Sequence, residues 1–275
     1  MRIRAMYVAC ALATAALLFA PASALGDEGE WGDAPEDGIA YPWIPVTGTF
    51  PTCFGGSASF IYHGALCWSH FPGSGAPQPV FDFEPDGNAG ACQGVTFPLY
   101  DQDECYQDGD AGLLFPPAYT IDNTNTIVPC TTTGIMAIAC ATAVWGVDID
   151  LQITNQMPVD GYFNALGDWD HSGFWNGSSA CPGGPAVEHF AINVPVPMGY
   201  TGPVSGLAGI QPFLAGPNDQ HVWFRFTVSE SPVGADWDGS GSFEDGETED
   251  YLLLIQADTP VDEASWGMIK TLFRP

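Results

Sequence analysis

Alternating acidic and hydroxyl side chains near the C-terminus have the spacing of a calcium-binding loop. Residues 236–247 read DWDGSGSFEDGE. Calcium takes about six to eight oxygen ligands, and a loop of about twelve positions supplies them with a glycine at the sharp turn and a bidentate glutamate at the end. An ordinary turn, in which Asp and Ser side chains bond backbone amides, is the alternative. The predicted calcium ligands are Asp236, Asp238, Ser240, the Ser242 carbonyl, Glu244 (directly or through water) and Glu247.

An incomplete second copy of this pattern begins at residue 168. It repeats the Asp-Trp-Asp-x-Ser-Gly order, and its predicted ligands are Asp168, Asp170 and Ser172. Its twelfth position is Ser179, so this copy lacks the closing acid of the template. We therefore expect weaker calcium binding here than at the first loop, and the ordinary turn stays open as the alternative.

The charge of the chain limits its partners. It carries 33 acids and 5 Lys and Arg, a formal net charge of -28. Such a protein repels phosphate backbones, which excludes a nucleic-acid binder. One-sided charge also opposes compaction unless cations bind or screen it, so calcium is a physically reasonable partner. A solubilising surface for a salty or calcium-rich exterior explains the same composition.

The first 24 residues have the pattern of an export signal. Arg2 and Arg4 precede the apolar run from Ala5 to Ala20, and an Ala-Ser-Ala cleavage pattern ends at residue 24. The run is shorter than the roughly 18 apolar residues of a spanning helix, and no later stretch reaches that length. We predict a secreted or cell-surface protein without a membrane span.

Export places the remaining cysteines in an oxidising compartment, where disulfides persist. The simplest scheme pairs near neighbours, although the sequence leaves the connectivity open. It joins Cys53 to Cys67, Cys92 to Cys105 and Cys130 to Cys140, and leaves Cys181 over.

Short runs of aliphatic and aromatic residues between frequent glycines and prolines predict an all-β fold, a β-sandwich of jelly-roll or immunoglobulin-like type with long Gly/Pro/Asp-rich loops. Residues 261–273 have the pattern of a short amphipathic C-terminal helix. The expected order is a signal peptide at 1–24, a loop-rich, disulfide-stapled lobe at 25–130, a sandwich core at 131–256, and a linker and tail at 257–275. The predicted strands are residues 57–62, 126–128, 136–145, 148–154, 189–194, 221–228 and 250–255.

One base lies inside a predicted strand. Arg225 alternates with the apolar positions of its strand, and a buried guanidinium requires a carboxylate partner. We predict an ion pair with Glu249 or Asp250 of the last strand; the alternative is an Arg225 that extends over Trp223 to solvent.

Several motifs together resemble the GEVED domain of bacterial secreted and surface proteins. The signature is Gly-Glu-Thr-Glu-Asp-Tyr at 246–251, and the opening Trp-Gly-Asp-Ala-Pro at 31–35 is similar to that of the family. Residues 81–87, 168–173 and 222–226 resemble further family segments in the right order. In the 168–173 loop, Asp170 and Ser172 replace the usual Asn and Asp. The resemblance implies an exported β-sandwich, often surface-attached, and no established enzymatic activity.

These features favour a calcium-binding structural or adhesive domain over an enzyme. A carbohydrate-binding module with exposed Trp and Tyr is the alternative, and its partners would be surface glycans; a structural domain would contact other surface proteins. A glycoside hydrolase would need paired carboxylates, such as Asp170 and Glu247, beside a sugar platform of Trp169 and Trp175. Solvent-exposed aromatic residues would favour sugar binding, whereas aromatic residues packed between sheets would favour the structural role.

Overall fold

The computed structural model describes most of the chain between residues 29 and 258. The described ranges are 29–30, 32–51, 54–55, 61–62, 65–68, 112–122, 124–155, 158–243 and 246–258. The predicted signal peptide, the helix at 261–273, Cys53, Cys92 and Cys105 lie outside these residues.

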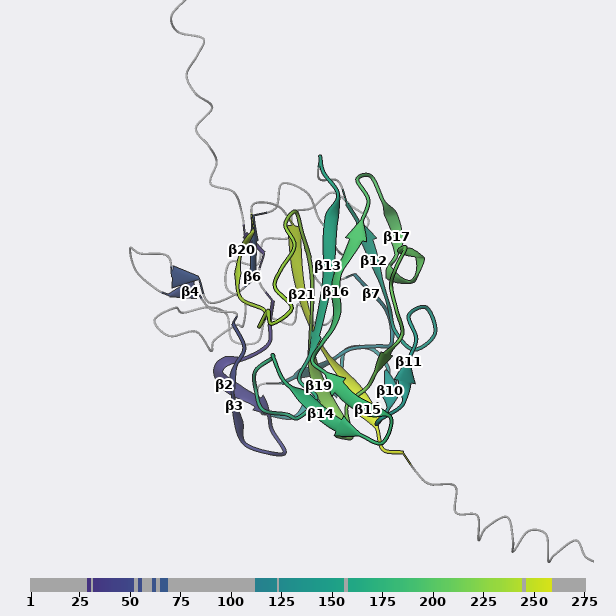
Figure 1. Cartoon of the computed structure of the whole chain (residues 1–275). Helices are drawn as coiled ribbons and strands as arrows, with labels where there is room; N and C mark the ends of the chain where they lie inside the picture. The colour runs from purple at the N-terminus through teal and green to yellow at the C-terminus, as the bar shows by residue number, and fades with distance from the viewer. Residues whose placement is uncertain are drawn as a thin grey trace, which may run out of the picture.

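The described residues form an all-β, sandwich-like structure, as the sequence predicts (Figure 1). Its helical content in these ranges is the 3-10 turn η2 at Val204–Gly206. The strands are β1 (Gly29–Glu30), β2 (Glu36–Tyr41), β3 (Val46–Thr49), β4 (Phe54–Gly55), β5 (Ile61–Tyr62), β6 (Ala65–Trp68), β7 (Leu113–Phe115), β8 (Tyr119–Ile121), β9 (Ile127–Pro129), β10 (Ala137–Ile138), β11 (Thr142–Ala143), β12 (Asp150–Thr154), β13 (Gly161–Gly167), β14 (Ser178–Cys181), β15 (Gly184–Val187), β16 (His189–Val196), β17 (Thr201–Pro203), β18 (Phe213–Leu214), β19 (Gln220–Ser229), β20 (Gly241–Phe243) and β21 (Gly246–Gln256).

The main sheet has the strand order β16-β13-β19-β21-β8-β9, and β10 pairs with β21 off this path. Its centre is the long antiparallel pair of β19 and β21, in register from Gln220↔Ile255 to Ser229↔Gly246. Alternate residues of β19 face opposite sides of the sheet, and both sides are covered. A strand buried on both faces needs two cores.

The inner core lies between the main sheet and the three-stranded sheet β17-β12-β7. Phe224, Phe226 and Tyr251 of the main sheet contribute to the same cluster as Leu151 and Ile153 of β12. This arrangement of two sheets over an apolar core is that of a sandwich.

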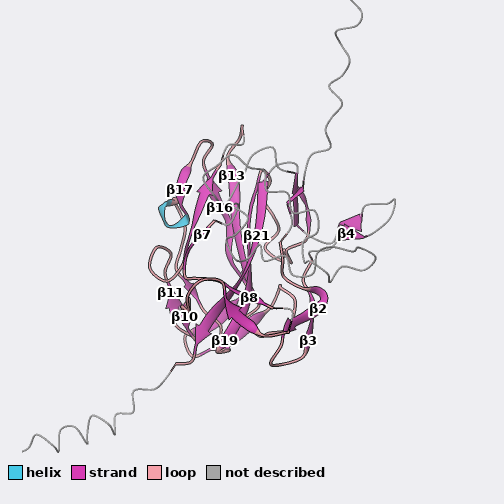
Figure 2. Ribbon diagram, turned by 180° about the vertical axis from the view of Figure 1, so that it is seen from behind, coloured by secondary structure: helices cyan, strands magenta, loops and turns pink. Residues whose placement is uncertain are grey.

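The outer face of the main sheet is covered by the N-terminal segment at residues 32–51. Tyr41 and Phe50 of this segment pack with Trp223 and Leu252 of the sheet. The view from behind shows the β2–β3 hairpin on the side of the main sheet away from β17 (Figure 2). Strands β7, β8 and β9 also belong to the two sheets, so the sandwich begins before the predicted boundary at residue 131.

The largest difference from the sequence prediction is β13, a central strand that was not expected. The last five residues of β13 are all buried, so burial does not alternate along the strand. Gly161, Asn164 and Gly167 also interrupt its apolar pattern. Strand-like periodicity is lost when both faces of a strand are covered. The predicted strand at 136–145 is broken instead into β10 and β11 by a turn at Cys140, whose φ is 56°.

Candidate metal centre

The second predicted loop forms a tight turn directly after β13. Asp168 is fully buried, and its Oδ1 accepts hydrogen bonds from the Ser172 backbone N–H (2.9 Å) and the Ser172 hydroxyl (3.2 Å). Its Oδ2 accepts from the Gly173 N–H at 2.8 Å and from the Tyr41 hydroxyl at 2.9 Å. Asp170 is exposed and accepts a second bond from the Ser172 N–H at 2.9 Å. The Asp-x-Asp-x-Ser-Gly spacing therefore produces the side-chain-to-amide bonds of the ordinary turn that was the alternative to a calcium loop.

A third carboxylate lies beside this loop and comes from another element. Glu188 lies between β15 and β16, and its backbone is fixed by bonds to Gly167 and Gly177 (3.0 Å each). Oxygens of Asp168, Asp170 and Glu188 lie within 4.8 Å of one another. Among the described residues, this is the one group of three or more acidic, histidine or cysteine side chains that lie close enough together to hold a metal ion. The spacing of the loop does not point to Glu188, because the β14–β15 hairpin separates this residue from the loop in sequence.

One oxygen of Glu188 is satisfied and the other is not. Its Oε2 accepts a hydrogen bond from the Gly177 N–H at 2.6 Å. A Cβ on residue 177 would lie only 2.9 Å from this oxygen, so the contact favours glycine. Its Oε1 is buried and has no hydrogen-bond partner within the described part of the chain. Glu188 is 0% exposed, and an unpartnered buried carboxylate oxygen is costly.

Burial and mutual repulsion disfavour the state in which all three carboxylates of the cluster are charged. Burial raises the pKa of the Asp168 carboxyl to about 7, although bonds from Gly173 and Tyr41 offset part of the increase. Burial, then the charges of Asp168 and Asp170, raise the pKa of Glu188 to about 8. A bound cation would stabilise the charged carboxylates. Because every ligand is an oxygen, the cluster suits a hard cation such as calcium.

The first predicted loop is arranged differently. Asp236 and Asp238 are exposed, whereas Glu247 is 2% exposed on β21. Glu247 lies opposite Val228, on the inner-core face, while Trp237 and Phe243 of the loop pack on the outer face.

The described residues of this loop therefore do not assemble the predicted shell. Asp238 Oδ1 accepts a hydrogen bond from the Ser240 N–H at 3.1 Å. Such a bond is typical of an ordinary turn, which is the alternative to a calcium loop. The side chains of Ser242 and Glu244 lie outside the described residues. Calcium binding at this loop stays a prediction from the sequence.

Arg225 forms the predicted ion pair with Asp250. The guanidinium donates to both carboxylate oxygens at 2.8 and 2.7 Å, and both side chains are fully buried. Arg225 also donates to the carbonyls of Pro51 (2.6 Å) and Gly239 (2.8 Å), and its guanidinium lies 4.5 Å from the Trp175 ring centroid. Glu249, the other predicted partner, accepts instead from the Tyr251 hydroxyl at 2.9 Å.

Two motifs that carry the family resemblance meet at this pair. Asp250 Oδ2 accepts the Ala34 N–H at 2.8 Å, and a Cβ on Gly32 would lie 2.2 Å from the same oxygen. Gly32 of the opening motif at 31–35 therefore has no room for a side chain, because it packs against Asp250 of the signature motif at 246–251.

The disulfides differ from the predicted scheme. Cys140 pairs with Cys181, so the predicted bond from Cys130 to Cys140 is wrong, and Cys181 is not left over. Cys130 is in a disulfide of its own. The Cys140 N–H donates to the Gly216 carbonyl at 3.0 Å, and Cys181 Sγ lies 3.5 Å from the adjacent Ala215 carbonyl oxygen, so both cysteines lie beside the same segment of the chain.

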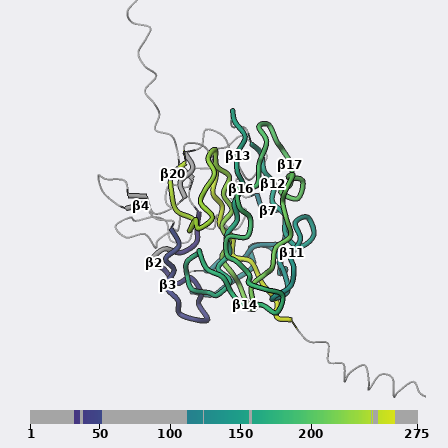
Figure 3. Tube along the Cα trace, in the orientation of Figure 1, coloured from purple at the N-terminus to yellow at the C-terminus, as the bar shows by residue number. Residues whose placement is uncertain are grey.

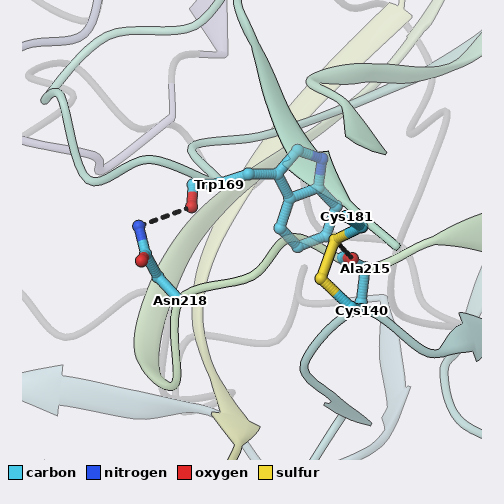
Figure 4. Close-up of a disulfide and its surroundings, with 5 residues drawn as sticks. All are labelled: Cys140, Trp169, Cys181, Ala215 and Asn218. Atoms are coloured by element: carbon cyan, nitrogen blue, oxygen red, sulfur yellow. Dashed lines mark hydrogen bonds between the residues drawn. A yellow bond between two sulfur atoms is a disulfide. The ribbon is translucent and has the colours of Figure 1, made fainter. Parts of the chain in front are cut away.

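The disulfide lies beside the loop of the acidic cluster. Figure 4 shows Trp169 between the disulfide and Asn218, whose side-chain amide donates to the Trp169 carbonyl at 3.0 Å. The Trp169 indole N–H also donates to the Val187 carbonyl at 2.8 Å, next to Glu188. The two parts of the cluster are therefore connected through Trp169.

The described tryptophans do not form a sugar platform. Trp169 and Trp175 are each 1% exposed, so the platform expected for a glycoside hydrolase is wrong. Trp145, Trp223 and Trp237 are also buried, whereas Trp43 is 36% exposed.

Comparison with known proteins adds no relative. No protein-family model matches the chain, and no curated protein matches it significantly. The resemblance to the GEVED family stays a prediction from the motifs. Within the described residues, no helix has the length and apolar character needed to cross a membrane.

Proposed function

We propose that this chain is a secreted or cell-surface β-sandwich domain with a structural or adhesive role, and that it binds calcium through Asp168, Asp170 and Glu188. The observation that carries the proposal is the convergence of three carboxylates, one of which has a buried oxygen without a hydrogen-bond partner among the described residues. Ser172 shapes the loop rather than closing the shell, because its hydroxyl and amide bond to Asp168.

Two further observations support the proposal, the first for the structural role over sugar binding and the second for the exported location. Five of the six tryptophans with described side chains are buried in the two cores. The Cys140–Cys181 disulfide is of the kind that persists in an oxidising exterior. Aromatic residues packed in this way stabilise a domain and leave little flat surface for a glycan.

Calorimetric titration of the full chain with calcium tests the proposal. We expect binding at the cluster, and an increase in the free energy of unfolding of about 2.7 kcal/mol at a hundredfold excess of calcium over Kd. Glu188→Gln should weaken binding about tenfold or more, because it removes a charged ligand. Asp236→Asn in the first loop should weaken calcium binding less than Glu188→Gln does.

Asp219→Asn is the matched control, since it removes one charge from an exposed acid near His171 without touching the cluster. If Asp219→Asn and Glu188→Gln weaken binding equally, calcium is attracted by general charge and the site is wrong. Wild-type protein that takes up no calcium and melts identically with and without a chelator would also overturn the proposal.

A further inference from the structure

The hairpin β2–β3 is attached to the acidic cluster by side-chain and backbone bonds. The Tyr41 hydroxyl at the end of β2 donates to Asp168 Oδ2 at 2.9 Å. Thr49 at the end of β3 donates its N–H (2.6 Å) and its hydroxyl (3.2 Å) to the Gly173 carbonyl. The Gly173 N–H in turn donates to Asp168, so both ends of the hairpin contact the same turn.

The turn and the hairpin also fit closely in space. Gly173 has a φ of +85°, and a Cβ there would lie 2.8 Å from the Thr47 carbonyl oxygen and 2.9 Å from Val46 Cγ1. The His171 ring lies 4.6 Å from the Tyr41 ring, centroid to centroid. Figure 3 traces the hairpin, in purple, beside the loop that joins β13 to β14. A change in the shape of this turn therefore reaches the hairpin directly.

The hairpin covers aromatic surface of the main sheet. The Trp223 indole N–H donates to the Ala40 carbonyl at 3.0 Å, and Trp223 N–H donates to the Tyr41 hydroxyl at 3.3 Å. Trp223 is 2% exposed under this cover. Release of the hairpin would expose the outer face of β19.

We propose that calcium at Asp168, Asp170 and Glu188 fixes the β2–β3 hairpin on the main sheet, and that removal of calcium releases it locally. This inference rests on the proposed function. The ion holds three like charges together and thereby keeps the 168–173 turn in the shape that presents Asp168 to Tyr41 and Gly173 to Thr49. Without the ion, the carboxylates either repel one another or take up protons, so their oxygens no longer converge on one cation, the turn loosens and both anchors of the hairpin weaken together.

Hydrogen exchange of the full chain, measured by mass spectrometry in calcium and in a chelator, tests the coupling. Peptides over residues 36–50 should exchange about tenfold faster in the chelator, because the hairpin opens locally. Peptides over β12, in the other sheet, should change little and serve as the internal control. Tyr41→Phe removes a bond to the ligand Asp168, so it should weaken calcium binding somewhat, but it should lower the calcium-induced protection of the hairpin by a larger factor than it lowers the calcium affinity measured by calorimetry.

The outcomes separate this coupling from the proposed function. Absence of calcium binding overturns both. Calcium binding with unchanged exchange in the hairpin overturns the coupling alone, as does an equal increase in the hairpin and β12, which would mean that calcium acts on the whole fold. Full calcium-dependent protection in Tyr41→Phe would contradict the Tyr41 anchor.

Discussion

Asp168 and Glu188 have raised pKa values because they are buried beside other acids. In the calcium-free folded protein these pKa values are about 7 and about 8. In the unfolded chain the pKa of such acids is about 4. Between these values the folded protein holds more protons than the unfolded chain does, so its stability falls as pH rises. Calcium replaces the protons, which removes this loss.

We therefore predict that the calcium-induced rise in Tm grows between about pH 6 and pH 8, as the two acids lose their protons in the calcium-free protein. Melting curves in calcium and in a chelator across this range measure the effect. Glu188→Gln should flatten the pH dependence in the chelator. A calcium effect that stays constant over the range would show that neither acid exchanges its proton for the ion.

The buried ion pair of Arg225 and Asp250 gives a second prediction at the residue scale. Arg225→Met leaves the Asp250 carboxylate buried without its partner, and we expect a loss of about 3–5 kcal/mol in the free energy of unfolding. The double change Arg225→Met and Asp250→Leu should recover part of the loss, because it removes the isolated charge. Chemical denaturation measures both. Equal destabilisation by the single and double variants would mean that the bonds to Pro51, Gly239 and Ala34 matter more than the charge.

At the scale of elements, the Cys140–Cys181 disulfide joins the turn between β10 and β11 to β14. The bond closes a loop with a sequence separation of 41 residues. The chain-entropy relation gives a stabilisation of about 4 kcal/mol for a loop of this length. We predict that Cys140→Ser with Cys181→Ser loses about 3–4 kcal/mol of unfolding free energy in guanidinium. Peptide mapping without reduction should recover the two residues in one linked fragment; a linked Cys130–Cys140 fragment would contradict the structure.

The whole molecule carries a net charge of -28, which disfavours the compact state through self-repulsion. Sodium chloride screens this repulsion, since the screening length falls from about 10 Å at 0.1 M to about 3 Å at 1 M. We predict that Tm rises with sodium chloride in both wild type and Glu188→Gln. A millimolar calcium addition should raise Tm in wild type and much less in Glu188→Gln. Equal responses of both proteins to calcium would mean that calcium acts only by screening.

Local sequence patterns predicted the all-β class and a carboxylate partner for Arg225, either Glu249 or Asp250, and they offered the turn at 168–173 as the alternative to a calcium loop. These features depend on neighbours along the chain or on the alternation of one strand, which the sequence contains. The spacing Asp-x-Asp-x-Ser-Gly was sufficient for the turn because the side chains bond amides two to five residues away. A buried Arg225 requires a carboxylate partner, and the predicted last strand begins with acids that could supply one.

Only the tertiary structure decided which acids form the cluster, which cysteines pair and what covers the main sheet. Glu188 reaches Asp168 through the β14–β15 hairpin, and Glu247 turns away from its loop because its register places it on the inner face of β21. Strand register and hairpin geometry bring distant residues together, and neither can be read from the spacing of residues along one chain. The sequence thus determined the chemistry that is present, whereas the pairing of strands decided where that chemistry meets.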